Sequence, residues 1–354
     1  MLLNQIYHSE IPLFLREFSA TDALLRLKSI GMDCGCEYTN FPAYKHSIKY
    51  NRYEHSLGTA LIIWHFSMDM KQSVAGLLHD ISTPVFSHSI DFLNNDYLLQ
   101  ESTEEDTEKI IYQSGQLMQL LKKYAISLEE VCNYHIYPIA DNNSPKLSAD
   151  RLEYSFRKFR SFGLKSLNDI ISYYSDLIIG MNEDQENEIM FTSSELAFDF
   201  SLCSLKNSIN DVSDDDRFAM KFLADILHYA INREILTRED LYTTESQVIS
   251  KLMSVQETKK AWEIFRNLSR TKRTLDNPCH NNSLPQNIVP SPFSQSDLSP
   301  SPGWITLSAK KRYINPYVQS HGRIMEISDK LNQEIQKFLD LKMDYWITAT
   351  TDIP

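Results

Sequence analysis

Apolar residues recur at helical spacing along most of the chain. After His55, four of them fall at i, i+3, i+4 and i+7, the spacing of one buried face of a helix. These four are Leu57, Ala60, Leu61 and Trp64. A second apolar segment, residues 74–78, ends at the pair His79-Asp80. Further helices are predicted over residues 86–93, 110–124, 152–159, 219–236 and 325–338. Together these segments predict a mainly α protein.

This helical pattern is lost near residue 273. Six of the thirteen prolines lie among Asn, Ser and Gln in residues 273–303, a composition typical of a loop or linker. Residues 304–307 then have strand character, and the last predicted helix follows them. We therefore expect a helical domain over residues 1–272, a linker over 273–303 and a small C-terminal α+β extension over 304–354.

The composition limits the possible partners and location. A net charge of −12 argues against an extended nucleic-acid surface, but leaves room for a local basic pocket that binds a small phosphate. The five cysteines are an odd number without zinc-ribbon spacing, and no leader-like segment opens the chain. The apolar runs are far shorter than the ~20 residues of a membrane span. We expect a cytoplasmic protein that does not contact membranes.

Two short stretches carry the candidate chemistry. Residues 52–58, Arg-Tyr-Glu-His-Ser-Leu-Gly, contain His55, and the pair His79-Asp80 follows 24 residues after it. Two imidazoles and a carboxylate are donors that a divalent transition metal prefers. A metal site in a helical bundle takes ligands from several helices, and Asp150, at the start of another amphipathic segment, is the best further carboxylate. These residues predict a metal-dependent hydrolase.

The order of these motifs resembles a known family. Residues 52–58, 77–80 (Leu-Leu-His-Asp), 84–88 (Pro-Val-Phe-Ser-His) and 150–154 (Asp-Arg-Leu-Glu-Tyr) are similar to the HD-domain metal-dependent phosphohydrolases, and closest to the branch of dNTP triphosphohydrolases. The resemblance covers about residues 24–158, with a fainter match at 311–316. It implies a helical HD-domain bundle and a homo-oligomer.

The resemblance also implies how the metal is held and used. The metal ligands would be His55, His79, Asp80 and Asp150, binding one divalent ion (Mn, Fe, Ni, Co or Mg) that activates a water for attack on a phosphate. Other HD proteins hold a second metal with additional histidines, for which His88 and His135 are the candidates here. The alternative for His135 is a packing position near the pocket or at the surface.

Roles in catalysis and substrate binding follow from the same resemblance. His88 and Asp91 are the candidates for proton transfer to the leaving group, although a pair at i, i+3 on a helix also fits a local hydrogen bond. Arg52 would hold a phosphate, and Tyr154 matches a residue beside the nucleotide sugar.

The substrate pocket departs from the dNTP branch. Thr83 and Glu104 stand where that branch has histidines, and Ser29 and Lys158 stand where it has a Gln and an Asp. The predicted function is therefore a phosphohydrolase acting on a nucleotide, such as a nucleoside monophosphate, or on a related phosphate ester. The alternatives are a dNTP triphosphohydrolase that releases inorganic triphosphate and a nucleotide-sensing HD module with weak catalysis.

Overall fold

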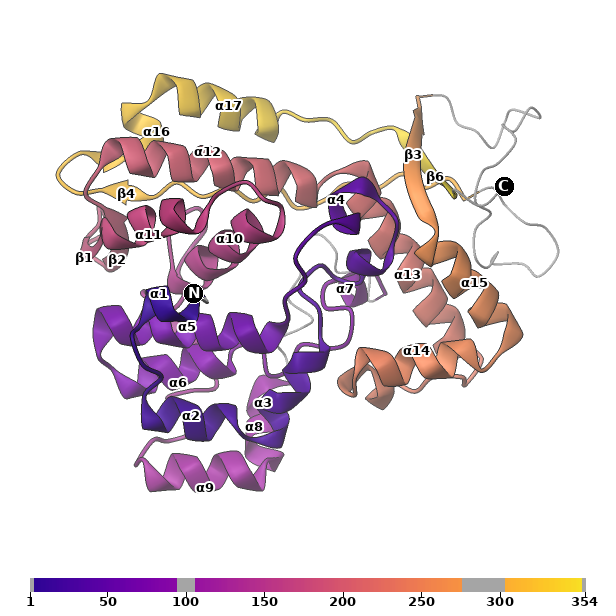
Figure 1. Cartoon of the computed structure of the whole chain (residues 1–354), viewed down its shortest axis with the longest axis horizontal. Coiled ribbons are helices and arrows are strands. Elements are labelled where there is room, and N and C mark those ends of the chain that lie inside the picture. Colours follow the sequence, from indigo (N-terminus) through magenta and orange to yellow (C-terminus); the bar gives the residue numbers. More distant parts are fainter. Residues whose placement is uncertain (1–2, 94–105, 276–302, 352–354) are drawn as a thin grey trace.

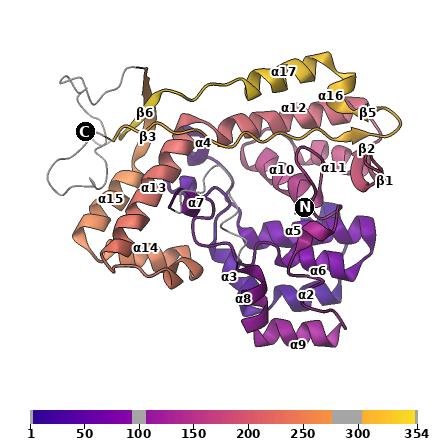
Figure 2. The ribbon, with the colours of Figure 1, turned by 180° about the vertical axis from the view of Figure 1, so that it is seen from behind.

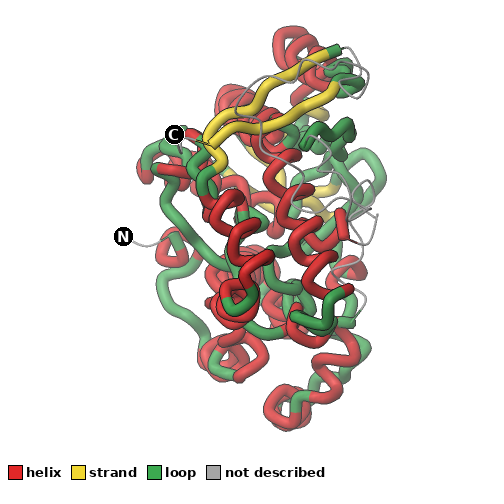
Figure 3. Tube along the Cα trace, turned by 90° about the vertical axis from the view of Figure 1, so that its right-hand side faces the viewer, coloured by secondary structure: helices red, strands yellow, loops and turns green. Residues whose placement is uncertain are grey.

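A computed structural model describes residues 3–93, 106–275 and 303–351, and these form a mainly α protein, as the apolar periodicity predicted (Figure 1). Among these residues, no helix is both long enough and apolar enough to cross a bilayer. Figure 3 shows the few strands in the upper half of that view, with helices making up most of the molecule.

The first 161 residues supply the helices that surround the candidate site. They are α1 (Asn4–Tyr7), α2 (Leu13–Ser19), α3 (Asp22–Arg26), η1 (Leu27–Ser29), η2 (Cys36–Tyr38), α4 (Pro42–Lys45), α5 (Arg52–Ser67), α6 (Met70–Leu78), α7 (Ser89–Leu93), α8 (Thr107–Gln113), α9 (Gly115–Lys123), η3 (Tyr134–Ile136) and α10 (Ala149–Ser161). Helix α5 packs against α6 and α10, so these three helices bring separated parts of the sequence together.

Local signals set the ends of α5 and α6. Asn51 caps α5 by accepting from the backbone N–H of Glu54, whose carboxylate accepts from the N–H of Asn51 in return. Met68 takes a left-handed conformation that ends α5, and Asp69 then caps α6. The tight turn between the two helices aligns their buried faces against each other.

The second part of the chain adds a long helix above this body and a helical lobe beside it (Figures 1 and 2). Its helices are α11 (Leu167–Ser175), α12 (Ser194–Asp211), α13 (Asp214–Asn232), η4 (Glu239–Tyr242), α14 (Glu245–Met253), α15 (Gln256–Arg266), α16 (Ile324–Ile327) and α17 (Asp329–Leu339). Helix α13 contacts both α7 and α15, so the lobe formed by α13, α14 and α15 is joined to the segment that carries His88.

Two small sheets tie the C-terminal segment to the helices. Their strands are β1 (Leu177–Met181), β2 (Asn187–Phe191), β3 (Leu268–Thr274), β4 (Tyr317–Val318), β5 (Gly322–Arg323) and β6 (Trp346–Thr351). The first sheet has the order β1-β2-β4-β5, with β2 and β4 parallel and the other pairs antiparallel. In the second, β3 and β6 are antiparallel, with Thr274 opposite Trp346 and a bulge between Leu268 and Arg270.

Two features of the structure bear on the predicted domain division. Strands β4 and β6 of the expected extension pair with β2 and β3 of the expected helical domain, so the extension shares both sheets with it. Most of the predicted linker, residues 276–302, lies outside the described residues.

Three predicted helices begin late or are interrupted. The helix expected over residues 86–93 begins only at Ser89, because Phe86 and Ser87 have φ angles of 59° and 46°. Left-handed conformations at residues other than glycine cost about 1–3 kcal/mol each and persist where surrounding contacts impose them. The other two segments are each divided by a serine that caps the following helix, Ser114 before α9 and Ser328 before α17.

The expected strand at residues 304–307 was wrong, because these residues form no strand and make a single bridge, between Ile305 and Ile347. Acidic runs are usually solvated, but in the run 214–216 Asp214 and Asp216 are buried. Asp214 pairs with Arg217 on the same helix, and this pairing makes its burial possible.

Aromatic side chains form the core between α10, α11, β2 and α12. Phe200 of α12 is fully buried and its ring lies 5.4 to 5.9 Å from those of its neighbours. The neighbouring rings are Phe156, Phe159, Tyr173 and Phe191.

Phe200→Ala should lower the free energy of unfolding by about 3–5 kcal/mol, because it removes a large buried ring and leaves a cavity. Phe198→Ala, at a half-buried position of the same helix, is the matched control and should cost clearly less. Urea unfolding followed by circular dichroism measures both, and equal losses would contradict this account of the core.

Candidate metal centre

Three proposed ligands lie together between α5 and α6. His55 is in the first turn of α5, and His79 and Asp80 directly follow α6. One ligand atom from each lies within 4.8 Å of the others, and all three residues are buried. Among the described residues, this is the one group of three or more His, Cys, Asp or Glu residues close enough to hold a metal.

Asp150 joins this group from the first turn of α10. Its Oδ1 lies 2.9 Å from Nε2 of His55 and 3.6 Å from Nε2 of His79. Its side chain is 20% exposed, against 2% for His55 and 11% for Asp80, so the cluster opens to solvent beside Asp150. The four residues named from the sequence therefore converge in space.

The outer nitrogens of both imidazoles have fixed partners. Nδ1 of His79 donates to the carbonyl of Gly76 at 2.7 Å, and Nδ1 of His55 lies 2.8 Å from a carboxylate oxygen of Glu153. These contacts place the Nδ1 hydrogen on the outer side of each ring and turn Nε2 toward the cluster. Such outer partners set the ring orientation that a metal ligand requires.

Glu153 is a functional residue that the sequence analysis did not single out. It is fully buried, and its other oxygen accepts from Nε of Arg157 at 2.6 Å. Gly58 makes its position possible, because a Cβ at Gly58 would lie 2.3 Å from the Glu153 carboxylate. The sequence did contain a signal for Glu153, because it lies three residues after Asp150 and both therefore face α5 from one side of α10.

Arg52 and Thr83 both contact the carboxylate of Asp80. Nη1 of Arg52 lies 3.1 and 3.0 Å from the two oxygens, and the Thr83 hydroxyl donates to one of them at 2.9 Å. Nε of Arg52 donates to the hydroxyl of Ser87 at 3.1 Å. Both residues were expected to bind substrate, and the structure places them where they orient Asp80.

The charges of the cluster favour a bound cation. Burial raises the pKa of Asp80, but Arg52 and the two imidazoles outweigh it and hold that pKa well below its ordinary value. Burial also raises the pKa of Asp150, but the contact with His55 outweighs it and lowers that pKa to about 2. Burial lowers the pKa of His55, but Asp150 and Glu153 outweigh it and raise it to about 10. The carboxylates thus stabilise a positive charge on His55 even without a metal.

The two further histidines named from the sequence, His88 and His135, each pair with an aspartate. Nδ1 of His88 is 2.8 Å from the carboxylate of the fully buried Asp91, while the His88 side chain is 27% exposed. His135 makes the same contact with Asp141 at 2.8 Å. The ring of Tyr134 lies between His135 and His79, with centroid separations of 4.4 and 4.9 Å. Neither His88 nor His135 belongs to a metal-type group among the described residues, so the second metal has no support here.

The remaining predicted pocket residues lie along α10 or outside the described part. Tyr154 and Lys158 are half-buried, and Nζ of Lys158 pairs with Asp211 of α12 at 2.5 Å. Burial lowers the pKa of Lys158, but Asp211 and Asp33 outweigh it, so the lysine stays charged. Glu104 lies outside the described residues.

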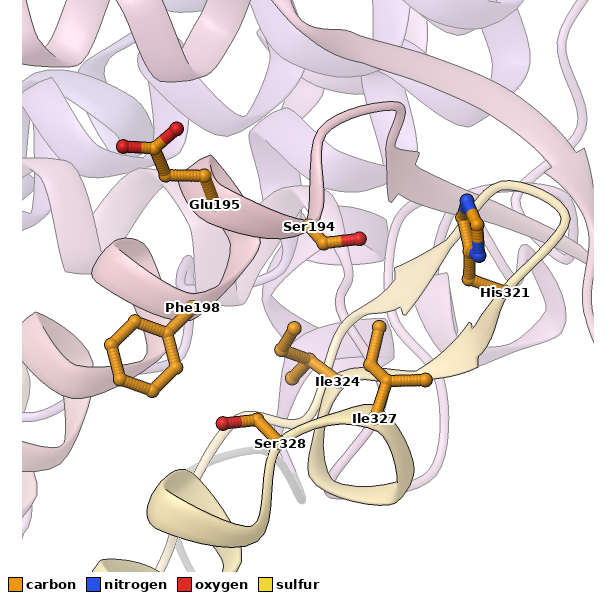
Figure 4. A pocket seen from close by; sticks show the side chains of 7 residues that line it. All are labelled: Ser194, Glu195, Phe198, His321, Ile324, Ile327 and Ser328. Atoms are coloured by element: carbon orange, nitrogen blue, oxygen red, sulfur yellow. The ribbon is translucent and has the colours of Figure 1, made fainter.

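A separate cavity of about 330 Å³ opens between α12, the β4–β5 hairpin and α16 (Figure 4). None of its lining residues belongs to the metal cluster. They are Ser194, Glu195, Phe198, His321, Ile324, Ile327 and Ser328. Glu195 is the one carboxylate among these seven, and the cavity lacks the concentrated donors of the metal centre.

Comparisons with known proteins agree with this geometry. Residues 52–153 match the model of the HD domain. The chain is 26% identical over 247 residues to the uncharacterized protein YdhJ of Bacillus subtilis (strain 168). This alignment covers 67% of this chain and 70% of YdhJ. It is 32% identical over 127 residues, 36% of each chain, to the metal-dependent phosphohydrolase cns2 of Cordyceps militaris.

A solved structure shares the whole fold. The crystal structure of a phosphohydrolase from Bacteroides thetaiotaomicron VPI-5482 superposes with a TM-score of 0.60 at 15% identity, over 97% of both chains. Residues 52–153 thus match an HD domain, and one sequence relative is named as a metal-dependent phosphohydrolase. An HD domain with a buried His–His–Asp cluster implies dependence on a divalent metal.

Metal affinity should rise with pH between 7 and 10, because the cation competes with a proton on His55. In the metal-free fold the pKa of His55 is about 10, above its ordinary 6.5. The proton on His55 therefore contributes its full stabilisation of that fold below about pH 6.5, and this stabilisation is lost as the pH rises through 10. Calorimetry of Mn²⁺ binding at pH 7, in two buffers of different ionisation enthalpy, should show about one proton released per ion. No release and a flat pH dependence would contradict the assignment of His55.

Glu153→Gln should weaken metal binding by about 10- to 100-fold, because the neutral amide orients and polarises His55 less well. The side-chain size is unchanged, so the helical content should be retained. Titration calorimetry measures the affinity, with Glu195→Gln at an exposed glutamate as the control. Unchanged affinity in both variants would rule out an orienting role for Glu153.

Proposed function

We propose that this protein is a metal-dependent phosphohydrolase that cleaves a phosphate ester or anhydride of a small molecule. The observation that carries the proposal is the convergence of His55, His79, Asp80 and Asp150, with Arg52 against Asp80 and hydrogen-bonded to Ser87, the residue before His88. The naming of one sequence relative as a metal-dependent phosphohydrolase supports the same reaction class.

The four ligands fit a divalent ion such as Mn, Fe, Ni, Co or Mg, because they combine two imidazole nitrogens with two carboxylates. When bound, this ion supplies positive charge to phosphoryl oxygens and lowers the pKa of a coordinated water. Asp80 and Asp150 remain ionised at neutral pH and so hold the cation without first losing protons.

The protein side chains add charge and proton transfer. Arg52 is permanently cationic and lies against Asp80, so it places a positive charge at the edge of the centre where a phosphate would bind. His88 is part-exposed and is oriented by the buried Asp91, which suits it to give a proton to a departing oxygen.

The proposed substrate is a nucleotide or a related phosphate ester. Tyr154 and Lys158 follow Asp150 by one and two helical turns, so they line the side of α10 that leads away from the metal. A tyrosine and a charged lysine are suited to contact the sugar or a further phosphate of such a substrate. This pocket differs from that of the dNTP triphosphohydrolases in Thr83 and Lys158.

The direct test is product release from nucleoside mono-, di- and triphosphates and p-nitrophenyl phosphate, with each of the five metals in turn. Asp80→Asn and Asp150→Asn should reduce turnover to background, because each removes a charged ligand. On substrates whose leaving group needs a proton, His88→Ala should lower kcat by about 10²- to 10⁴-fold, the usual contribution of a general acid. His228→Ala, at an exposed histidine, is the control.

The product distinguishes the alternatives. Inorganic phosphate or pyrophosphate supports the proposal in its present form, whereas inorganic triphosphate would assign the dNTP triphosphohydrolase reaction. Nucleotide binding without turnover under any metal would contradict hydrolysis and favour a sensing module.

A further inference from the structure

Glu245, the first residue of α14, is a buried carboxylate with no part in the chemistry described above. Its side chain enters the region between the helical lobe and the candidate site, and the residue is 4% exposed. One oxygen accepts from the backbone N–H of Gly31 at 2.9 Å and from that of Phe86 at 3.4 Å, and the other accepts from the Tyr38 hydroxyl at 2.7 Å. A buried charge is tolerated when donors surround it in this way.

The segment held by Glu245 is the left-handed turn at Phe86 and Ser87. Such a turn needs external contacts to persist, since neither residue is a glycine. The lobe supplies them: the N–H of Val85 donates to the carbonyl of Leu241 at 2.8 Å, and the Phe86 ring lies 6.0 Å from that of Trp262. The turn therefore takes its conformation from the lobe as well as from its own sequence.

This turn leads directly to the groups proposed for catalysis. The hydroxyl of Ser87 accepts from Arg52 at 3.1 Å and donates to the carbonyl of Gly31 at 3.2 Å. The N–H of Gly31 thus donates to Glu245, and its carbonyl accepts from Ser87. A continuous set of hydrogen bonds runs from Glu245 through Gly31 and Ser87 to Arg52, and His88 is the next residue along the chain.

We propose that Glu245 is a positioning residue that holds the turn 84–88 and thereby sets the places of Arg52 and His88 for phosphoryl transfer. The proposal rests on the proposed function, in which those two residues act on the phosphate. It assigns the lobe of α13, α14 and α15 a part in catalysis although the lobe supplies no metal ligand in the described structure.

The kinetic test compares Glu245→Ala with Glu245→Gln on two esters, an alkyl phosphate and p-nitrophenyl phosphate. Displacement of a catalytic group by about 1 Å can cost about 100-fold in rate, so Glu245→Ala should lower kcat for the alkyl ester by about 10- to 100-fold. The loss should be smaller for p-nitrophenyl phosphate, whose leaving group needs no proton. Glu245→Gln keeps an acceptor oxygen for the two N–H groups and should restore most of the rate.

Two comparisons separate positioning from general stability. The double variant Glu245→Ala/His88→Ala should lose less than the product of the two single losses, because both changes remove the same contribution. Glu257→Ala, at an exposed glutamate of the same lobe, should behave like the unmodified protein. Equal losses on both esters together with a fully multiplicative double variant would overturn the positioning of His88, and failure of Glu245→Gln to restore the rate would overturn the proposal as a whole.

A second measurement does not depend on activity. In Glu245→Ala, hydrogen exchange should become faster in peptides that cover residues 84–91, while the interior of α5 should keep its protection. If the unmodified protein hydrolyses no ester but this change occurs, the proposed function fails and the role of Glu245 in holding the turn stands. Unchanged exchange in residues 84–91 overturns the role of Glu245 in either case.

Discussion

The structure depends on how four ionisable side chains share one buried site. The carboxylates of Asp80 and Asp150 each lie within 3.9 Å of Nε2 of both His55 and His79, and two carboxylates held against the same imidazoles repel each other unless positive charge lies between them. The metal-free protein supplies that charge with Arg52 and a proton on His55. A divalent cation would supply it more effectively, because it can contact all four donors at once.

The need to balance these charges accounts for the residues that surround the cluster. Glu153 orients His55 and is itself held by Arg157, while Gly58 leaves room for that carboxylate on the surface of α5. On the opposite side, Ser87 links Arg52 to Gly31, and Glu245 links Gly31 to the helical lobe. Each charged group therefore has a fixed partner, and the site is organised before any substrate arrives.

Part of this arrangement could be predicted from the sequence and part could not. Periodicity identified α5, α6, α10 and α13 but not α11, α12, α14 or α15. The residue types at 55, 79, 80 and 150 indicated a metal site because few other roles need such donors in helical segments. The turn at Phe86 and Ser87 gave no such signal, since no glycine marks its left-handed conformation. Glu245 lies 159 residues after Phe86, and only the packing of the lobe brings the two together.

The burial of Asp214 and Asp216 illustrates the same limit. A run of three aspartates is usually solvated, and only the partners contributed by other elements reverse that expectation. Asp214 gains Tyr345 from outside its helix, in addition to Arg217 within it, and Asp216 gains Tyr44. Local sequence indicates which groups are polar, whereas tertiary contacts decide which polar groups can be buried.

The most direct test of the central claim is anomalous diffraction from a crystal of the protein grown with Mn²⁺. The account predicts one strong anomalous peak at bonding distance from His55, His79, Asp80 and Asp150, and its absence from crystals of Asp80→Asn. A peak at other residues, or no peak when the four side chains are well ordered, would contradict the assignment of this cluster as the metal centre.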